Sequence, residues 1–434
     1  MYALGLDIGT TSISAAAIDT ETGRELASVT EHNDAALPGG VSERLQSPER
    51  IVALAESVID AVKTQLGERP RCIGVTGQMH GRLYYDARGR AVSALATWED
   101  GRGDLPRGDT TRARALSALT GYDMATGYGL TTCYCDVLDG AIPAAAVGMC
   151  TIADYVVMRL TSRRSALVHA SNAASFGLFD LAAGRFDAAA VAAAGIPAAL
   201  LPELAPGEAI AGTTPDGVPV AVAIGDNQAG IYAAAGLGGD TVVNIGTSSQ
   251  LSVLAASTTP PRSLECRPYV GGKYIWLGAG LCGGSALAEL NALFRDVYAC
   301  AGLALDAAAV YALMERAATE TQGAENVPVV STLFRGTRAD PARRGEITSL
   351  APGSLDMGRL TLGFYRGVCD ELRGFYALLP EALRQGRIIV CGNAARRSKA
   401  LLDTLSERFG REAQLCSYVE EAAAGAALIA AATL

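Results

Sequence analysis

A six-residue pattern that occurs once in each half of the chain places the strongest constraint on the fold. The first copy is Asp7-Ile8-Gly9-Thr10-Thr11-Ser12 and the second is Asn244-Ile245-Gly246-Thr247-Ser248-Ser249. Each copy lies between two short apolar runs, which predicts a strand, a tight turn and a second strand. One copy alone would be explained by an ordinary hairpin with polar turn residues. Two copies, one per half, indicate two related domains that face each other.

The residues of the first turn are suited to binding phosphate. Gly9 lets a ligand approach the backbone closely. The amides of such a turn and the hydroxyl groups of Thr10, Thr11 and Ser12 can bind phosphate oxygens. Asp7 lies where its carboxylate could reach a metal ion carried by those phosphates. We therefore expect each turn to hold one side of the phosphates of a nucleotide.

The length of the chain also favours two domains. A chain of 434 residues is longer than one hydrophobic core ordinarily supports. The stretch Leu237-Gly238-Gly239-Asp240 resembles a hinge, so we predict an N-terminal domain over residues 1–238 and a C-terminal domain over 239–434. Ser47 and Pro48 open a predicted helix that ends near Leu66. A final helix, Glu420 to Ala432, has little polar surface and is expected to pack inside.

The composition argues against several classes of partner. The formal net charge of −9 does not favour nucleic acid or an anionic membrane surface as the partner. The ten cysteines are scattered and the chain has three histidines, so a zinc site is not expected. Free thiols fit a reducing cytoplasm, and the apolar runs are interrupted before they reach membrane length. We predict a cytoplasmic protein, a monomer or a homodimer, that acts on a small molecule.

Two loops carry side chains suited to a sugar. The stretch Gly77-Gln78-Met79-His80-Gly81 follows a predicted strand, and ligands of open α/β sheets bind beyond the carboxyl ends of strands. A hydrogen-bonded structural role would explain His80 equally well. The stretch Thr97-Trp98-Glu99-Asp100-Gly101-Arg102 offers an aromatic face, a carboxylate and a donor, as polyol recognition requires. Seen alone, it would be a surface turn.

Asp226 lies at the carboxyl end of the predicted strand Pro219–Ile224, at the start of a helix. The small residues around it allow a substrate to come close. A carboxylate there could act as a general base that accepts the proton of an attacking hydroxyl group. The alternative is a helix N-cap aspartate, which is common.

Two glycine turns in the second half precede predicted helices. Leu277 to Ser285 is rich in glycine, and Cys391-Gly392-Asn393-Ala394 follows the predicted strand Arg387–Val390. Either turn could contact a nucleotide, although glycine-rich loops before helices are frequent.

Taken together and in this order, these motifs resemble those of the FGGY carbohydrate kinases, members of the actin-like ATPase superfamily. The resemblance covers essentially the whole chain. It implies an α/β fold with two actin-like (ribonuclease H-like) domains and a central interdomain cleft. Within the family, the Gly77–Gly81 and Thr97–Arg102 stretches and Thr126-Gly127-Tyr128-Gly129 are most similar to those of sedoheptulokinases. Xylulokinases are the nearest alternative.

The resemblance implies a role for each matching residue. Asp226 would be the catalytic base, and Asp7 and Asp226 would flank a magnesium ion. ATP phosphates would contact Gly9, Thr10, Thr11 and Ser12 in one domain, and the adenosine side would use Gly283, Gly392 and Asn393. The remaining positions form two sets: Gly246, Thr247 and Ser248 on the phosphates, and Gln78, Met79, His80, Trp98, Asp100 and Arg102 around the sugar. The family usually has three glycines where this chain has Cys391-Gly392-Asn393.

The implied reaction is ATP-dependent phosphorylation of the terminal primary hydroxyl of a ketose, sedoheptulose to sedoheptulose 7-phosphate, with D-xylulose or another pentulose as the alternative. Two other classes stay open. A non-catalytic nucleotide-binding protein of the actin superfamily would explain the repeated turns, but it needs no polyol pocket. A phosphotransferase for acetate would not use the loop around Trp98, and a polyphosphate site would be expected to be more basic.

Overall fold

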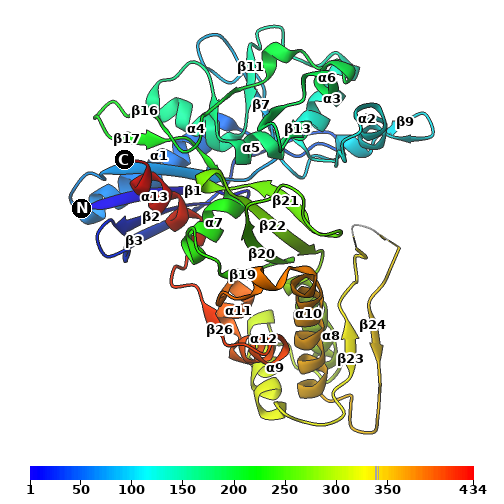
Figure 1. The fold of residues 1–434 in the computed structure, drawn as a ribbon. Helices are drawn as coiled ribbons and strands as arrows, with labels where there is room; N and C mark the ends of the chain where they lie inside the picture. Colours follow the sequence, from blue (N-terminus) through cyan, green and yellow to red (C-terminus); the bar gives the residue numbers. More distant parts are fainter. Residues whose placement is uncertain (338–339, 341) are drawn as a thin grey trace. The chain divides into compact units, whose positions relative to one another are not determined.

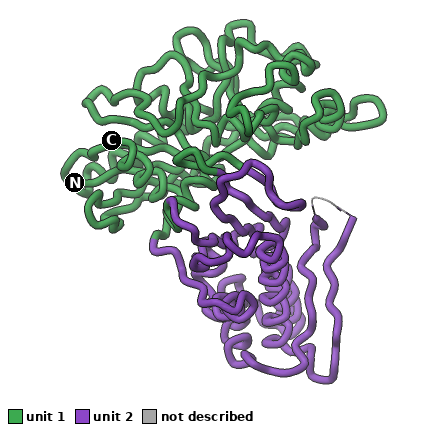
Figure 2. The backbone as a smooth tube through the Cα atoms, viewed as in Figure 1, with its two compact units in different colours: residues 1–236, 267–273, 418–434 green, residues 237–266, 274–417 purple. Residues whose placement is uncertain are grey.

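The computed structural model describes residues 1–337, 340 and 342–434. The chain forms two compact units (Figure 1, Figure 2). Unit 1 comprises residues 1–236, 267–273 and 418–434, and unit 2 comprises 237–266 and 274–417. The predicted single boundary between 238 and 239 lies near the first division, but two later segments return to unit 1. The reason is packing, because those segments lie against the sheet and helices of unit 1, as described below.

Unit 1 is built on a seven-stranded mixed sheet with the order β16-β17-β6-β1-β2-β3, in which β18 also pairs with β6. Its strands are β1 (Tyr2–Ile8), β2 (Ser12–Asp19), β3 (Glu25–His32), β6 (Cys72–Gly77), β16 (Ile210–Thr213), β17 (Pro219–Ala221) and β18 (Ile224–Gly225). β1 runs antiparallel to β2 and parallel to β6. Its helices are α1 (Pro48–Leu66), α2 (Arg112–Thr120), α3 (Gly129–Asp139), α4 (Ile152–Thr161), α5 (Ala170–Ser175), α6 (Ala188–Ala193), α7 (Asp226–Ala235) and α13 (Glu421–Thr433).

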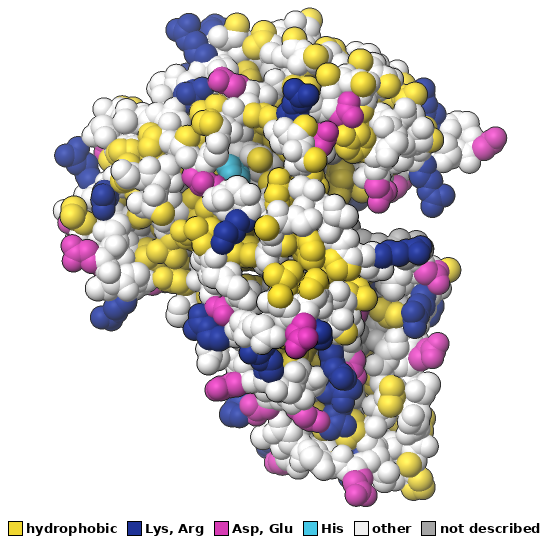
Figure 3. Space-filling view, viewed as in Figure 1, with side chains coloured by type: hydrophobic (Ala, Val, Ile, Leu, Met, Phe, Trp, Pro, Cys, Tyr) yellow, Lys and Arg dark blue, Asp and Glu magenta, His cyan; other side chains and the backbone are white. Residues whose placement is uncertain are grey.

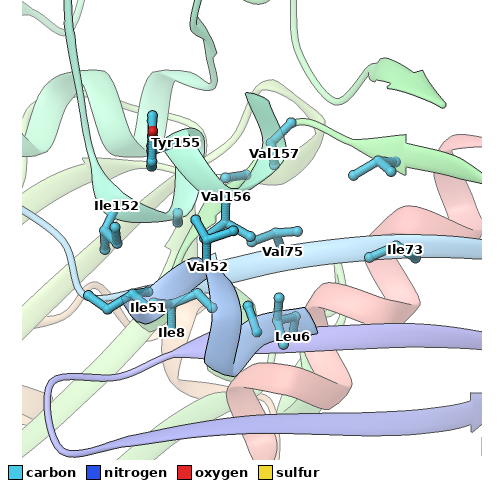
Figure 4. Packing of buried hydrophobic residues seen from close by; sticks show 14 of the residues in the cluster. Leu6, Ile8, Ile51, Val52, Ile73, Val75, Ile152, Tyr155, Val156 and Val157 are labelled. Atoms are coloured by element: carbon cyan, nitrogen blue, oxygen red, sulfur yellow. The ribbon is translucent and has the colours of Figure 1, made fainter. Parts of the chain in front are cut away.

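The alternation of side chains along β1 divides its residues between two faces. Leu4, Leu6 and Ile8 belong to a buried cluster formed with α1 and α4, and Figure 4 shows Ile51 of α1 among these side chains. The predicted helix after Ser47 is confirmed. Its N-cap hydroxyl accepts the N–H of Arg50, and Gly67 ends it in the left-handed conformation that glycine tolerates.

The opposite face of the same sheet is covered by α13. This face presents small residues, so the helix backbone approaches very closely: a Cβ atom at Gly5 would lie 1.7 Å from the carbonyl oxygen of Ala423. Gly74 of β6 and Gly425 of α13 are equally tight, against Ala426 and Ala229. The expectation that the last helix packs inside is confirmed, and this contact explains why 418–434 belong to unit 1.

Unit 2 contains the strands of a second mixed sheet, with the order β21-β22-β20-β19-β25-β26. These strands are β19 (Thr241–Ile245), β20 (Ser249–Ala255), β21 (Glu265–Pro268, whose last two residues belong to unit 1), β22 (Tyr274–Gly280), β25 (Ile388–Cys391) and β26 (Ala413–Leu415). Its helices are α8 (Gly284–Cys300), α9 (Ala307–Thr321), α10 (Met357–Leu378), α11 (Asn393–Arg397) and α12 (Lys399–Phe409). They pack around a core of their own.

The two units repeat one arrangement of strands. The hairpin β1–β2 lies beside the parallel strand β6, and the hairpin β19–β20 lies beside the parallel strand β25. The sequence repeat falls on the two hairpin turns. The predicted α/β fold with two related domains is therefore confirmed, while the central cleft stays a prediction.

The surface of the described residues carries both signs of charge, and on the face shown in Figure 3 basic and acidic side chains are interspersed. None of the described helices has the length and apolar character needed to cross a bilayer.

Candidate functional site

The backbone of the turn between β1 and β2 is held by side chains from two other segments. Gly9 is required by close approach, because a Cβ atom there would lie 2.7 Å from the carbonyl oxygen of Ser12. Asn33 Nδ2 donates to Gly9 O over 2.9 Å, and Gln46 Nε2 donates to Thr10 O over 2.8 Å. Thr11 is exposed and Thr10 is partly exposed. The backbone of the turn is therefore held in place while part of the turn faces solvent.

The loop after β6 is joined to this turn. The N–H of Gln78 donates to Ile8 O over 2.9 Å, and Gln78 Nε2 donates to Gln46 Oε1, also over 2.9 Å. Gln78 and Met79 are both buried, and Met79 packs against Gly225, where a Cβ atom would lie 2.6 Å from its methyl group. These two predicted sugar residues thus fix the positions of the turn between β1 and β2 and of the residue before Asp226.

His80 has an unusual backbone conformation, with a φ of 69°. Such a value is uncommon outside glycine and is held here by hydrogen bonds. The N–H of His80 donates to Ser175 Oγ over 3.1 Å, and Nδ1 lies 2.7 Å from the carbonyl oxygen of Ser175, so Nδ1 carries the proton. The imidazole stacks on Tyr128 with a centroid distance of 4.7 Å. These hydrogen bonds fit the structural alternative for His80, and its contact with a sugar stays a prediction.

Trp98 contacts the turn between β1 and β2. It follows β8 (Leu95–Ala96), which belongs to a small sheet with β5 (Leu45–Gln46) and β4 (Ala36–Leu37). Its side chain is 49% exposed, and its indole N–H donates to Thr10 Oγ1 over 3.0 Å. The segment that contains Gly127 packs closely on Trp98. Only glycine fits at this position, because a Cβ atom there would lie 2.0 Å from Trp98 O. The predicted sugar loop and the predicted phosphate turn are thus in direct contact.

Asp100 and Arg102 form part of a buried ionic network beneath Trp98. Asp100 has no exposed surface and accepts from the Arg102 N–H and from Arg102 Nε, the latter over 2.8 Å. Arg102 Nη1 donates to Asp136 Oδ1 over 2.9 Å, and Arg82 pairs with the other oxygen of Asp136. Breaking such a pair by removing one partner is costly, because it leaves a buried charge uncompensated. The network fixes the loop that presents Trp98.

Asp226 is the first residue of α7, and Gly225 is the N-cap. The alternative of an N-cap aspartate is therefore wrong. Burial raises the pKa of Asp226, while the Asn227 N–H, 2.6 Å from Oδ1, and Arg267 oppose the rise. Burial also raises the pKa of Asp7, from 3.8 to about 7, and the carboxylates of Asp226 and Glu420 add to that rise. The negative charges of Asp226 and Glu420 therefore act on Asp7 at this edge of the unit 1 sheet.

In unit 2 the second turn is held in a comparable way. The N–H groups of Gly283 and Ser285 donate to Thr247 O over 3.1 and 3.0 Å, which places the start of α8 against the turn. Gly392 has a φ of 92°, and a Cβ atom there would lie 2.6 Å from Ile245 O. Thr247, Ser248 and Asn393 are exposed. The structure therefore brings together Gly246, Thr247, Ser248, Gly283 and Gly392, with Asn393 opening α11.

Several residues around the site were not predicted. Glu420 and Arg267 act on Asp7 and Asp226 from segments that are remote in the sequence. Gln46 and Asp136 belong to stretches with no recognisable motif. Only Tyr128 gave a signal, because it lies within the Thr126–Gly129 stretch.

Comparison with known proteins gives a consistent result. Residues 2–244 match the model of the N-terminal domain of the FGGY family of carbohydrate kinases, and residues 241–434 match the model of its C-terminal domain. The sedoheptulokinase of Mus musculus is 30% identical, over 98% of this chain and 96% of that protein, and the human sedoheptulokinase is 29% identical over the same shares. The crystal structure of xylulose kinase from Rhodospirillum rubrum has a TM-score of 0.84 at 25% identity and covers 99% of this chain and 89% of that one.

Proposed function

This chain belongs to the FGGY family of carbohydrate kinases, and we propose that it transfers the γ-phosphoryl group of ATP to the terminal primary hydroxyl group of sedoheptulose, giving sedoheptulose 7-phosphate. The observation that carries this choice is the similarity to mammalian sedoheptulokinase at 30% identity over nearly the full length of both chains. A pentulose such as D-xylulose is the second candidate, and it is favoured by the similarity to the Rhodospirillum rubrum xylulose kinase.

In this proposal Asp226 is the general base. It accepts the proton of the sugar hydroxyl while the oxygen attacks the γ-phosphorus and ADP leaves. Its position at the start of α7, immediately after β18, supports the role, since backbone and side chain are both held. Positioning of the reacting groups and electrostatic stabilisation account for most of the rate in such phosphoryl transfers.

The negative charges that act on Asp7 fit a magnesium ion. Mg²⁺ prefers carboxylate oxygens together with substrate phosphates, and a divalent cation would stabilise the ionised form of Asp7 against its burial and against the charges of Asp226 and Glu420. We propose Asp7 and Asp226 as its protein ligands. When bound, the ion neutralises negative charge on the transferring phosphoryl group.

The phosphates of ATP would contact the two turns, through Gly9, Thr10, Thr11 and Ser12 in unit 1 and Gly246, Thr247 and Ser248 in unit 2. The adenosine side would use Gly283, Gly392 and Asn393. On the sugar side, Trp98 offers an exposed ring and His80 a partly exposed one. We propose that Gln78, Met79, Asp100 and Arg102 complete this site chiefly by shaping it, since their hydrogen bonds and packing run to other parts of unit 1.

The proposal is tested by measuring ADP release from MgATP with sedoheptulose, xylulose, ribulose, fructose and glycerol. Strong turnover of sedoheptulose with little turnover of xylulose is expected. Preference for xylulose or ribulose would leave the kinase mechanism in place and overturn the substrate. ADP release that no sugar stimulates would favour a non-catalytic nucleotide-binding protein.

Replacing Trp98 tests the sugar site. Trp98→Ala is expected to raise the KM for the sugar about tenfold, which corresponds to roughly 1.4 kcal/mol of binding, with a smaller change in kcat. The reason is that the exposed indole provides the apolar face for the sugar. Trp98→Phe is the matched control, because it keeps a ring but loses the hydrogen bond to Thr10. If the KM in the alanine variant stays at the wild-type value, Trp98 lies outside the site.

The raised pKa of Asp7 predicts a pH-dependent cost in stability. A carboxyl group with a higher pKa in the folded state binds more protons there, so its stabilising effect is present at low pH and is lost as the pH rises from 3.8 to about 7. Asp7→Asn stays neutral. Without Mg²⁺, the Tm of this variant minus that of the wild type is therefore expected to increase by a few degrees across this pH range. Thermal unfolding at several pH values measures it, and a constant difference would contradict the prediction.

A further inference from the structure

A chain of hydrogen bonds runs from the partly exposed Glu208 through the buried His169 and Ser171 to the residue before Asp226. The N–H of Ser171 donates to His169 Nδ1 over 3.1 Å, so this nitrogen is an acceptor and the ring proton is on Nε2. Nε2 lies 3.3 Å from Glu208 Oε1. Ser171 Oγ lies 2.9 Å from the same Nδ1 and accepts the N–H of Gly225 over 3.0 Å. Every hydrogen bond in the chain then has a defined direction.

A serine, a histidine and a carboxylate in this order resemble a nucleophilic triad. Burial excludes that role, because Ser171 is 1% exposed and His169 is 2% exposed, and a nucleophile must reach its substrate. The hydroxyl oxygen of Ser171 instead accepts the N–H of Gly225, the residue before Asp226. What the chain of hydrogen bonds can do is hold a backbone in place.

The backbone before Asp226 depends on such support. β18 has two residues, and other polar groups near it are also held by side chains: Thr76 Oγ1 donates to Ile224 O over 2.7 Å, and Asn172 Nδ2 donates to Ala223 O over 3.3 Å. Ser171 and Asn172 both lie on the six-residue helix α5. A short helix thus sets the position of the strand that ends at Asp226.

The same helix holds His80. Ser175, four residues after Ser171, accepts the N–H of His80 at its hydroxyl group and the Nδ1–H at its carbonyl oxygen. At the other end of the chain of hydrogen bonds, Glu208 accepts the N–H of Gly271 over 3.0 Å. Gly271 lies in the segment 267–273, whose Pro268 O accepts from Gln228 of α7. Both attachments lead back to the neighbourhood of Asp226.

We propose that Ser171, His169 and Glu208 are positioning residues for Asp226, and that α5 fixes the distance between Asp226 and His80 through two hydroxyl groups one turn apart. Ser171 holds the backbone before the general base, and Ser175 holds His80 on the sugar side. The proposal rests on the proposed function, since it takes Asp226 as the base of the kinase. It assigns to α5 a role that its sequence, Ala170-Ser171-Asn172-Ala173-Ala174-Ser175, does not indicate.

The test compares the same substitution at two positions of one helix. Ser171→Ala is expected to lower kcat about tenfold to a hundredfold, as small displacements of a catalytic group do, while the KM for the sugar stays within about threefold. Ser175→Ala is expected to raise the KM for the sugar with a smaller effect on kcat. Equal changes of kcat and KM in both variants would show a merely structural role and overturn the proposal.

Glu208 provides a second test that does not depend on Ser171. Glu208→Gln keeps an oxygen that accepts from His169 and Gly271, so it is expected to retain most of the activity, whereas Glu208→Ala should lower kcat as Ser171→Ala does. The double variant Ser171→Ala with Glu208→Ala should be little worse than either single variant, because both interrupt one chain. If the wild type is active and kcat is unchanged in Ser171→Ala and Glu208→Ala, the positioning role is overturned and the proposed function is not affected. A wild type that phosphorylates no sugar would overturn the proposed function, and with it the role of the chain.

Discussion

Asp226→Asn is expected to bind the sugar with near wild-type affinity while kcat falls about a hundredfold to ten-thousandfold, the range that general base catalysis contributes. The amide has nearly the same shape as the carboxylate and can still accept the N–H of Asn227, so α7 should begin as before. It cannot accept the proton of the sugar hydroxyl group. Calorimetric titration with sugar and a coupled assay for ADP measure the two effects separately.

Gln228→Ala is a useful companion variant. Gln228 is buried two residues further along the same helix, and its side chain donates to Pro268 O. Its loss should lower stability without the collapse of kcat seen for Asp226→Asn. Near wild-type turnover by Asp226→Asn would remove Asp226 as the base.

The second large effect is expected in stability, from Gly425→Ala. A Cβ atom at this position would lie 1.8 Å from Ala229 O of α7, and a backbone oxygen cannot move aside without moving the helix. Overpacking of this kind costs about 1–3 kcal/mol, and more where backbone is involved. We expect the variant to unfold at a clearly lower denaturant concentration, which equilibrium unfolding in urea measures, and to lose activity because α7 carries Asp226.

Gly230→Ala is the matched control for this prediction. Gly230 lies on α7 beside Ala229, and a Cβ atom there would meet no atom within 4 Å. Both substitutions gain roughly 1 kcal/mol of helix propensity. The control should therefore be neutral or stabilising. Equal stability of the two variants would contradict the close packing of α13 on α7.

Local features were predictable because the information lies within a few residues. The hairpin turns follow from their glycines and flanking apolar runs, and α1 follows from Ser47, Pro48 and its apolar face. Asp226 was expected at the end of a strand, and the structure places it there. Its N-cap alternative failed because Gly225, not Asp226, takes the non-helical conformation before the helix.

What could not be predicted depends on contacts between distant residues. Gln78 and Asp100 are expected at a sugar, and the residues that hold them, Gln46 and the backbone N–H of Arg44, lie 32 and 56 positions away. No local pattern assigns residues 418–434 to unit 1, because the small residues that admit α13 are on β1 and β6. The pairing of His169 with Glu208 was hidden for the same reason, since a lone histidine and a lone glutamate carry no spacing signal.

The position of α13 also determines the order in which the protein can be completed on the ribosome. β1 and β6 are synthesised first, but the helix that covers their small-residue face emerges only after residues 237–417. All residues of unit 2 are therefore available to fold while unit 1 still has an uncovered sheet face, although domains generally fold in the order of their synthesis. Unit 1 contains the first strands of this chain to be synthesised, yet its sheet is covered only after all of unit 2 has been made.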